Sequence, residues 1–490
     1  MAHPTKAALP HLENLKSVHI IGVCGTLMGA FAAFLKRRGI AVTGSDQNVY
    51  PPMSDVLTKA GIQLYSGYRA ENLNASGAKP DLVVIGNVIN AQNPEARAAI
   101  DEGYCYSSLP EAMEKLLLQN TRNLCVSGTH GKTTTSSLLA HVLVTAGRDP
   151  NYFIGGVAHD LPFSFNVPNV GKGHPFILEG DEYDTAFWDK VPKFNHYLPD
   201  DAILTSVEYD HADIYPDFAA VVRAFEGLIT RIRPGGKLIA CFEYPAIKDL
   251  AAQAAKLGTQ VITYGSAPAA GIRFAPARVR VENEKTRFDV MEGDRKVDEV
   301  TTLMSGNHNV LNALAVWIEC RELGLNPEQI HTGLSTFQGV KRRQEIRGEA
   351  RGVMVMDDFA HHPTAVRETL KGLRSKYPDR RIVAVFEPRS ATSRRKVFQK
   401  DYAIAFDEAD ATFIMVPFDQ SKISSDDQFS SDQLVDDISG RGKSGHLMNT
   451  VEEGVAQVAA FAKSGDLVAV LSNGGFGGFI PKLLDAIKQG

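Results

Sequence analysis

A short apolar stretch, a loop with two glycines and a helical pattern follow one another in the segment Asn123-Leu-Cys-Val-Ser-Gly-Thr-His-Gly-Lys-Thr-Thr-Thr135. Gly128 and Gly131 let the backbone approach an anion because neither carries a Cβ atom, and the free N–H groups of the first helical turn face the loop. Lys132 can reach the terminal phosphates of a nucleotide, and the Thr133 hydroxyl can bind Mg²⁺. The segment therefore predicts a phosphate-binding loop.

The loop is a shortened form of the eight-residue phosphate-binding pattern, because Cys125 stands where that pattern has a glycine. The strand before the loop and the helix after it are the context in which such loops bind phosphate. The residues expected to contact ATP here are Gly128, Thr129, His130, Gly131, Lys132, Thr133 and Thr134.

Carboxylates and a histidine follow two predicted strands of the same region. The strand Phe176 to Glu179 ends in Glu-Gly-Asp-Glu-Tyr-Asp, and a second strand, Ile203 to Glu208, leads into Tyr-Asp-His211. The carboxyl ends of parallel strands form the edge at which open α/β sheets bind ligands. Mg²⁺ prefers oxygen ligands. We therefore expect Thr133 and Glu179 to be metal ligands, and His211 to belong to the same functional edge.

The first hundred residues show a βαβ pattern: a strand from Val18 to Val23, a helix to about Arg38, and a strand from Ile40 that ends at Ser45 and Asp46. A further strand, Asp81 to Ile85, is followed by Asn87. The pattern predicts a Rossmann-like domain. The glycine spacing, Gly22, Gly25 and Gly29, departs from the dinucleotide fingerprint. An NAD-linked dehydrogenase stays an alternative that would leave the phosphate loop unexplained.

The remainder of the chain predicts two further regions of α/β structure. Short alternating stretches between Ile272 and Met304 indicate an antiparallel meander, and a helix from about Asn309 to Leu323 follows. After a hinge at residues 339–343, apolar runs alternate with helical stretches; they are Val353 to Met356, Ile382 to Phe386, Thr412 to Val416 and Leu467 to Leu471. We expect three domains, at residues 1–108, 109–338 and 339–490.

Composition excludes several classes of protein. The net charge of −5 offers no basic face for nucleic acid, and no stretch approaches the length of apolar residues that a bilayer requires. The five cysteines are scattered and form neither a disulfide framework nor a zinc motif. We expect a cytoplasmic protein with small-molecule partners. The sequence leaves the oligomeric state open between a monomer and a homodimer.

Motifs in all three predicted domains together resemble the Mur ligases of bacterial cell-wall synthesis. They are Gly128-Thr-His-Gly-Lys-Thr-Thr134, the strand end at Glu179, Asp210-His211, Gly306-Asn-His-Asn-Val-Leu-Asn312, Arg342-Arg343 and Asp357-Asp-Phe-Ala-His-His-Pro363. The resemblance implies an N-terminal domain for a UDP-linked substrate, a central ATPase-like domain, and a C-terminal Rossmann-like domain that closes over ATP and carries part of the amine site.

The resemblance also implies roles for individual residues. Lys132 would contact the β- and γ-phosphates, Thr133 and Glu179 would hold one Mg²⁺, and His211 would hold a second. The further nucleotide contacts would be Asn309, Asn312, Arg343 and Asp358. The UDP-substrate contacts would be Gly22, Gly25, Thr26, Ser45, Asp46 and Asn87. Some members carry a carbamylated lysine at the position of Glu226, and no lysine lies nearby here.

Within the family, three segments resemble the members that recycle cell-wall peptide. They are residues 48–54, Glu179 to Asp189 and residues 472–478. Those members join L-alanyl-γ-D-glutamyl-meso-diaminopimelate to UDP-N-acetylmuramate. The Asp-Asn-Pro-Arg signature of the diaminopimelate-adding members is absent after the strand at Thr412, so we expect Arg389 to read the diaminopimelate group.

Tyr183, Phe187 and Trp188 replace small residues of the related L-alanine-adding members, which leaves two interpretations open: core packing, or a site shaped for a longer amine. The L-alanine-adding ligase itself is the first alternative function. A nucleotide-responsive binding protein without turnover is the second, although a sensor has no need of a second metal ligand such as His211.

Overall fold

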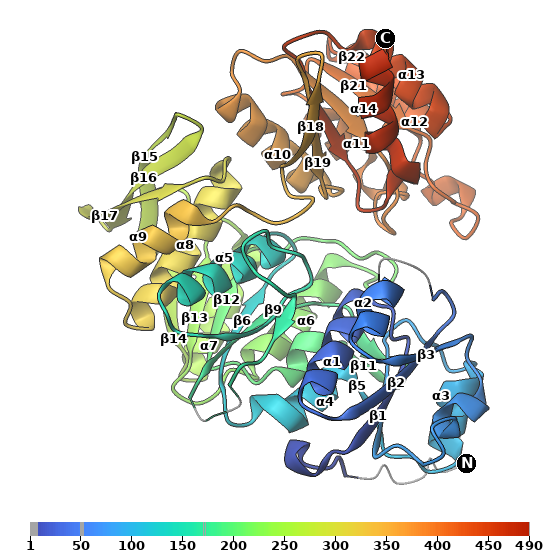
Figure 1. Ribbon diagram of the computed structural model, residues 1–490. Coiled ribbons are helices and arrows are strands. Elements are labelled where there is room, and N and C mark those ends of the chain that lie inside the picture. Colours follow the sequence, from blue (N-terminus) through green and yellow to red (C-terminus); the bar gives the residue numbers. More distant parts are fainter. Residues whose placement is uncertain (1–7, 50–52, 170, 172, 490) are drawn as a thin grey trace. The chain divides into compact units, whose positions relative to one another are not determined.

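The structure is a computed structural model that describes residues 8–49, 53–169, 171 and 173–489. The chain divides into two compact units (Figure 1). The first unit comprises residues up to Val207, Ala219–Tyr264 and Ala315–Gly333. The second comprises Glu208–Phe218, Gly265–Leu314 and the residues from Leu334 onward. Each unit is described below by itself.

The N-terminal part of the first unit is a parallel sheet with the strand order β3-β2-β1-β4-β5. Its strands are β1 (Ser17–Ile21), β2 (Ala41–Asp46), β3 (Gln63–Ser66), β4 (Leu82–Ile85) and β5 (Tyr106–Ser108), and its helices are α1 (Thr26–Arg37), α2 (Met53–Lys59) and α3 (Pro94–Asp101). The order reverses at β1, which pairs with β2 on one side and β4 on the other. Sheets of this kind bind ligands at the carboxyl end of that reversal. The predicted Rossmann-like domain is confirmed.

The central part of the first unit is built on strands in the order β14-β13-β12-β6-β9-β7-β8, which are parallel except for the β7–β8 pair. The strands are β6 (Arg122–Ser127), β7 (Asn151–Phe153), β8 (Phe165–Asn166), β9 (Pro175–Gly180), β12 (Asp201–Leu204), β13 (Lys237–Cys241) and β14 (Gln260–Tyr264), with a hairpin of β10 (Asp184–Ala186) and β11 (Asp189–Pro192). The helices are α4 (Leu109–Met113), α5 (Lys132–Thr145), α6 (Phe218–Ile229) and α7 (Pro245–Lys256).

Aromatic side chains join the two sheets of the first unit. Phe165 of β8 packs edge-on against Phe31 and Phe34 of α1, with ring centroids 5.8 and 5.1 Å apart. Trp188, in the turn of the β10–β11 hairpin, packs on Tyr106 of β5 at 5.3 Å and on Phe187 at 4.6 Å. Phe187 and Trp188 therefore pack against the N-terminal core, which is the simpler of the two interpretations of these aromatics.

The second unit contains an antiparallel meander and a second α/β sheet. The meander consists of β15 (Phe274–Glu282), β16 (Lys285–Glu292) and β17 (Arg295–Thr302), as the alternating pattern predicted. The boundary between the units falls within α8 (Asn307–Glu322) and again within α9 (Pro327–Thr336).

The C-terminal sheet has the order β18-β19-β23-β20-β21-β22, and only the β18–β19 pair is antiparallel. Its strands are β18 (Glu345–Ala350), β19 (Val353–Asp358), β20 (Ile382–Phe386), β21 (Ala411–Met415), β22 (Ser444–Met448) and β23 (Leu467–Leu471). Helices α10 (Pro363–Lys376), α11 (Gln399–Ala405) and α12 (Ser431–Gly440) cover one face, and α13 (Val451–Phe461) and α14 (Phe479–Gln489) cover the other (Figure 1). The predicted three-domain α/β fold is confirmed.

Two details differ from the prediction. The strand expected from Ile203 to Glu208 ends at Leu204, because Thr205 and Ser206 turn to bond the phosphate loop instead of a neighbouring strand. Ten strands were not expected from the sequence: β3, β5, β7, β8, β10, β11, β13, β14, β18 and β22. Among the described residues, none of the helices is both long enough and apolar enough to cross a membrane.

Candidate active site

The predicted phosphate loop connects the central strand β6 to α5. Gly128 has a φ of 137°, and a Cβ atom added there would lie 2.2 Å from the Thr205 hydroxyl oxygen, so only glycine fits. Thr205 donates a hydrogen bond to the His130 carbonyl (2.6 Å), and the His130 N–H donates to the Ser206 hydroxyl (2.7 Å). The end of β12 therefore fixes the shape of the loop.

Lys132, the first residue of α5, turns its ammonium group back over the loop. Its Nζ donates to the carbonyl oxygens of Gly128 (2.7 Å) and Thr129 (3.2 Å) and lies 2.8 Å from a carboxylate oxygen of Glu182. Burial opposes the positive charge, but Glu182 and Asp181 more than compensate and raise the pKa of Lys132. The ammonium group is thus held charged inside the loop.

Thr133 and Glu179 lie together, as predicted. The Thr133 hydroxyl donates a 2.6 Å hydrogen bond to Glu179, and the other Glu179 oxygen accepts the Gly155 N–H at 2.6 Å. Burial raises the pKa of Glu179 although these bonds oppose the shift. A hydroxyl and a carboxylate beside a phosphate loop are the oxygen donors that Mg²⁺ prefers, so these residues fit the predicted ion.

The predicted UDP-substrate loop follows β1, and its shape depends on β2. The N–H groups of Gly22 and Val23 donate to the Ser45 carbonyl, at 2.8 and 3.1 Å. Asp46 accepts hydrogen bonds from the N–H groups of Cys24 (2.9 Å) and Asn48 (3.2 Å). Ser45 and Asp46 therefore hold the loop in place with their backbone and carboxylate oxygens.

The other predicted residues of this loop stand at element ends. Gly25 precedes α1, Thr26 is its first residue, and Asn87 is exposed just beyond β4. The side chain of Ser45 is fully buried, and its hydroxyl bonds to no residue that the structure describes. Of the segment 48–54 used for the family resemblance, residues 50–52 lie outside the described residues.

His211 belongs to the second unit, in the segment Glu208–Phe218. Its backbone has a φ of 55°, a conformation that non-glycine residues seldom adopt. The neighbouring Asp210 accepts hydrogen bonds from the His211 N–H (2.7 Å) and the Thr392 hydroxyl (2.6 Å), and the His361 Nε2 lies 3.7 Å from it. Burial disfavours the charge of Asp210, but the neighbouring His361, His211 and His362 hold its pKa well below the usual value.

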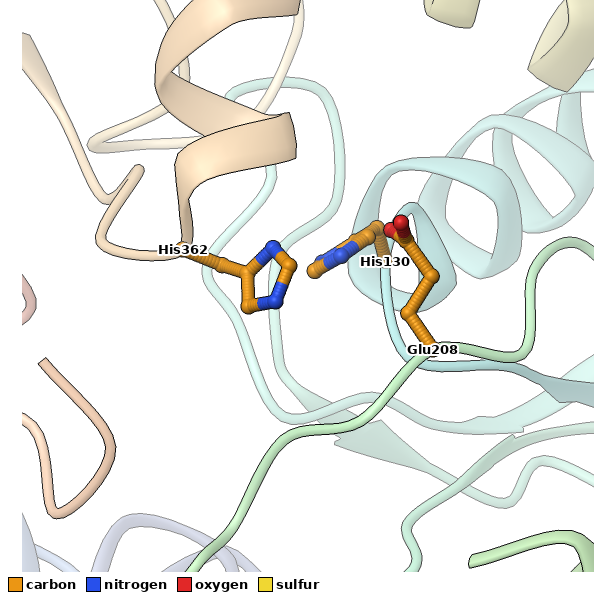
Figure 2. Close-up of side chains that lie close together, drawn as sticks. All are labelled: His130, Glu208 and His362. Carbon is orange, nitrogen blue, oxygen red and sulfur yellow. The ribbon is translucent and has the colours of Figure 1, made fainter. Parts of the chain in front are cut away.

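Glu208 and His362, which the prediction did not include, also lie in the second unit. A carboxylate oxygen of Glu208 and a ring nitrogen of His362 lie within 4.8 Å of each other, and the Thr364 hydroxyl donates to Glu208 at 3.0 Å. Figure 2 shows these two side chains, together with His130, which projects from the phosphate loop of the first unit. His362 also caps α10, whereas His361 lies against the Phe359 carbonyl, so the two adjacent histidines have different partners.

The predicted nucleotide residues of the second unit lie on α8 and beside β19. Asn309 donates to the Ser305 carbonyl (2.8 Å), and Asn312 donates to the Asn309 side chain (3.2 Å). Asp358 accepts the N–H groups of Gln344 (2.8 Å) and Ala360 (2.7 Å), so its carboxylate organises two loops. Burial raises the pKa of Asp358, against the opposing charge of Arg343.

Arg343 and Arg389 each lie against an aromatic ring of the second unit. The guanidinium of Arg343 is 4.6 Å from the centre of the Phe359 ring, and that of Arg389 is 4.0 Å from the centre of the Phe418 ring. Arg389 also donates to Glu387 at 3.3 Å. Both arginines lie at the carboxyl edge of the C-terminal sheet, where a ligand of an open α/β sheet binds.

Three of the five cysteines are poor nucleophiles. Burial raises the pKa of Cys24 to about 11 and that of Cys125 and Cys241 to about 12, so none of these thiols is ionised near neutrality.

Comparison with known proteins gives matches along nearly the whole chain. Models of the Mur ligase family match at residues 17–121 (Mur ligase family, catalytic domain), 126–319 (Mur ligase middle domain) and 342–474 (Mur ligase, glutamate ligase domain).

Two curated relatives and one solved structure illustrate the similarity. The UDP-N-acetylmuramate–L-alanyl-γ-D-glutamyl-meso-2,6-diaminoheptandioate ligase of Escherichia coli is 37% identical over 96% of this chain and 98% of its own length. The UDP-N-acetylmuramate–L-alanine ligase of Kineococcus radiotolerans is 36% identical over 85% of this chain and 84% of its own. The crystal structure of a murein peptide ligase from Psychrobacter arcticus has a TM-score of 0.67 and 32% identity, and the match covers 96% of this chain and 99% of that one. The chain belongs to the Mur ligase family.

Proposed function

We propose that the chain is a cytoplasmic, ATP-dependent ligase that joins L-alanyl-γ-D-glutamyl-meso-diaminopimelate to UDP-N-acetylmuramate. Such a reaction returns cell-wall peptide to the UDP-linked precursor. The observation that carries the proposal is the arrangement of Lys132, Thr133 and Glu179 around one phosphate loop, in a chain similar over its whole length to a ligase of that name. We further propose domain limits of 1–108, 109–338 and 339–490.

The chemistry requires activation of a carboxylate. An amide does not form from a carboxylate and an amine in water, so the lactyl carboxylate of UDP-N-acetylmuramate first attacks the γ-phosphorus of ATP. ADP leaves and an acyl phosphate forms. The amine of the peptide then attacks the carbonyl carbon, loses a proton, and displaces inorganic phosphate. Positioning and charge stabilisation supply most of the catalysis in phosphoryl transfer.

The residues of the first unit have defined tasks in this scheme. Lys132 binds the β- and γ-phosphates and neutralises the charge that develops on the transferred group. Thr133 and Glu179 are the proposed ligands of Mg²⁺, which supplies positive charge to the phosphates when bound. Gly22, Gly25, Thr26 and Asn87 face the UDP group from the loops after β1 and β4, while Ser45 and Asp46 hold the first of these loops.

The second unit supplies the remaining proposed contacts. His211 is the candidate ligand of a second Mg²⁺, and Asn309 and Asn312 are the candidate adenosine contacts. Arg343 is proposed to contact the phosphates, and Asp358 to hold the loop of Arg343. Arg389 is proposed to read a carboxylate of diaminopimelate, because a guanidinium binds a carboxylate through two parallel hydrogen bonds.

The main alternative is an L-alanine-adding ligase, which the similar identity to such a relative favours. A coupled assay of ADP release with UDP-N-acetylmuramate tests both, with the tripeptide, its lysine-containing analogue and L-alanine as separate amines. We expect ADP release with the diaminopimelate tripeptide and less than about a hundredth of that rate with L-alanine. ADP release with L-alanine and none with the tripeptide would establish the alternative.

A further inference from the structure

The four acidic residues at the end of β9 and just after it have four different partners. Glu179 bonds Thr133 and the Gly155 N–H, Asp181 lies 2.5 Å from Lys193, and Asp184 lies 2.8 Å from Lys190. Glu182 accepts a hydrogen bond from Lys132 of the phosphate loop. Glu179, whose carboxylate is suited to a metal, is thus only three residues from Glu182, whose carboxylate faces Lys132.

The Lys132–Glu182 pair lies out of solvent. The side chains of Lys132 and Glu182 are 13% and 2% exposed, and the ammonium nitrogen lies 3.0 and 2.8 Å from the two carboxylate oxygens. An ion pair in this setting is costly to break, because each separated charge is left without water or a counter-charge. The pair is therefore a strong constraint on where Lys132 points.

The pair also uses hydrogen-bonding capacity that ATP would need. An ammonium group has three N–H donors. In Lys132 the three are matched by the Gly128 carbonyl, the Thr129 carbonyl and Glu182. The two carbonyls belong to the loop, whose shape is fixed by hydrogen bonds to Thr205 and Ser206. Glu182 is consequently the partner that an arriving phosphate can replace.

We propose that Glu182 is a positioning residue that occupies the place of the γ-phosphate on Lys132 and gives up the ammonium group when ATP binds. The proposal rests on the nucleotide role proposed above for Lys132. While Glu182 neutralises the lysine, the loop has little attraction for inorganic phosphate and other small anions. A polyphosphate that also contacts the loop N–H groups can displace the carboxylate, at a cost that lowers the affinity for the nucleoside triphosphate.

The test compares two nucleotides in the full chain. Glu182→Gln keeps the size of the side chain and removes its charge, and Asp184→Asn removes a charge from the same segment without touching Lys132. Dissociation constants are measured by calorimetry for AMP and for adenylyl imidodiphosphate, the non-hydrolysable ATP analogue. AMP lacks the phosphates that reach Lys132, so it reports on the adenosine contacts alone.

We expect Glu182→Gln to bind adenylyl imidodiphosphate about tenfold more tightly than the unaltered chain, while AMP affinity stays within about twofold. Asp184→Asn should leave both constants unchanged. Glu182→Asp, whose carboxylate is drawn back by one methylene, should tighten the analogue by a smaller factor and serves if the glutamine variant does not fold. General damage to the site would weaken the binding of both ligands. Tighter binding of the analogue alone therefore cannot result from a misfolded loop.

Unchanged or weaker binding of the analogue by Glu182→Gln, with AMP binding intact, overturns the proposal. Because no amine substrate enters these measurements, they are separate from the test of the proposed function. If the chain fails to join the tripeptide but Glu182→Gln still binds adenylyl imidodiphosphate more tightly, the proposal about Glu182 holds. The chain then has a different amine substrate. If the chain joins the tripeptide but Glu182→Gln binds adenylyl imidodiphosphate no more tightly, the proposed function holds and the proposed role of Glu182 does not.

Discussion

The two ends of the central sheet both carry buried acidic groups, but the groups differ in whether they have hydrogen-bond partners. At the carboxyl end, Glu179 and Glu182 each bond a polar side chain of α5, at 2.6 and 3.0 Å. At the amino end, Glu319 of α8 is fully buried, and neither of its oxygens bonds to a residue that the structure describes. The carboxylates at the carboxyl end therefore have side-chain partners, and the carboxyl group at the amino end has no hydrogen bond to a described residue.

The surroundings of Glu319 explain its state. Arg122 pairs with Asp201 at 2.6 Å where β6 and β12 begin, and Lys237 pairs with Glu322 at 2.7 Å. The two nearby cations are thus already committed to other acids. Burial and the charges of Asp201 and Glu322 raise the pKa of Glu319 from 4.5 to about 8, against the opposing charges of Arg122 and Lys237.

The comparison teaches what makes a buried acid useful to a ligand. A carboxylate that bonds a lysine or a threonine holds a partner that an arriving phosphate or cation can take over. A carboxyl group that stays protonated has no charged partner that a ligand could replace. The predictions below separate these two situations, beginning with the largest expected effect.

Replacement of Lys132 by alanine should reduce ligase turnover by more than about a thousandfold, because the charge on the transferred phosphoryl group loses its main counter-charge. Ligase turnover is measured as steady-state ADP release with UDP-N-acetylmuramate and the tripeptide. Near-normal turnover would contradict the mechanism.

The same variant leaves Glu182 buried without its cation, which costs roughly 3 kcal/mol of stability. The double variant Lys132→Ala with Glu182→Gln removes that cost and should recover most of the unfolding free energy, while turnover stays lost. Recovery of stability without activity separates the chemical role of Lys132 from its structural one. Lys190→Ala, which alters an exposed pair, is the matched control.

Replacement of Glu179 by glutamine should lower the catalytic efficiency for ATP by about a hundredfold, because a neutral amide is a weaker Mg²⁺ ligand than a carboxylate. It should also raise the Mg²⁺ concentration needed for half-maximal activity by about tenfold. A titration of activity with Mg²⁺ at fixed ATP gives both values, with Asp184→Asn as control. An unchanged Mg²⁺ requirement would remove Glu179 from the proposed ligand set.

The phosphate loop could be predicted because its signal is local. Strand, glycines, lysine and helix follow one another within thirteen residues, and each residue type has its own physical task. The partner of Lys132 could not be predicted in the same way. Glu182 lies 50 residues further along, and which of four acids faces the lysine depends on the turn after β9.

The fold was predicted where apolar runs are long and was incomplete where they are short. Ile382 to Phe386 was expected as a strand and is one, buried along its whole length. β3 and β22 were not expected, because each is a partly exposed strand at the margin of its sheet, with no continuous apolar run. The burial of Glu319 could not be predicted either, because a glutamate in a helix is usually exposed and only the packing of α8 reveals its burial.

Glu319→Gln should stabilise the chain, and the gain should grow with pH. Below pH 4.5, the ordinary pKa, glutamate is protonated in the folded and the unfolded chain alike, and its titration makes no difference. Between that pH and about 8 the unfolded chain releases the proton and the folded chain keeps it, so stability falls as pH rises. Glutamine has no proton to release. Its advantage in unfolding free energy should therefore increase by roughly 1 kcal/mol or more between pH 6 and pH 8.

Thermal unfolding of the two chains at pH 5, 7 and 9 measures this advantage as a difference in Tm. Glu322→Gln is the matched control, because Glu322 lies on the same helix, 28% exposed and paired with Lys237. Its loss should lower Tm slightly at all three pH values. A Tm difference for Glu319→Gln that is constant or shrinks toward pH 9 would mean that Glu319 is ionised in the folded chain. Both ends of the central sheet would then hold charged carboxylates, and the contrast between them would rest on their partners alone.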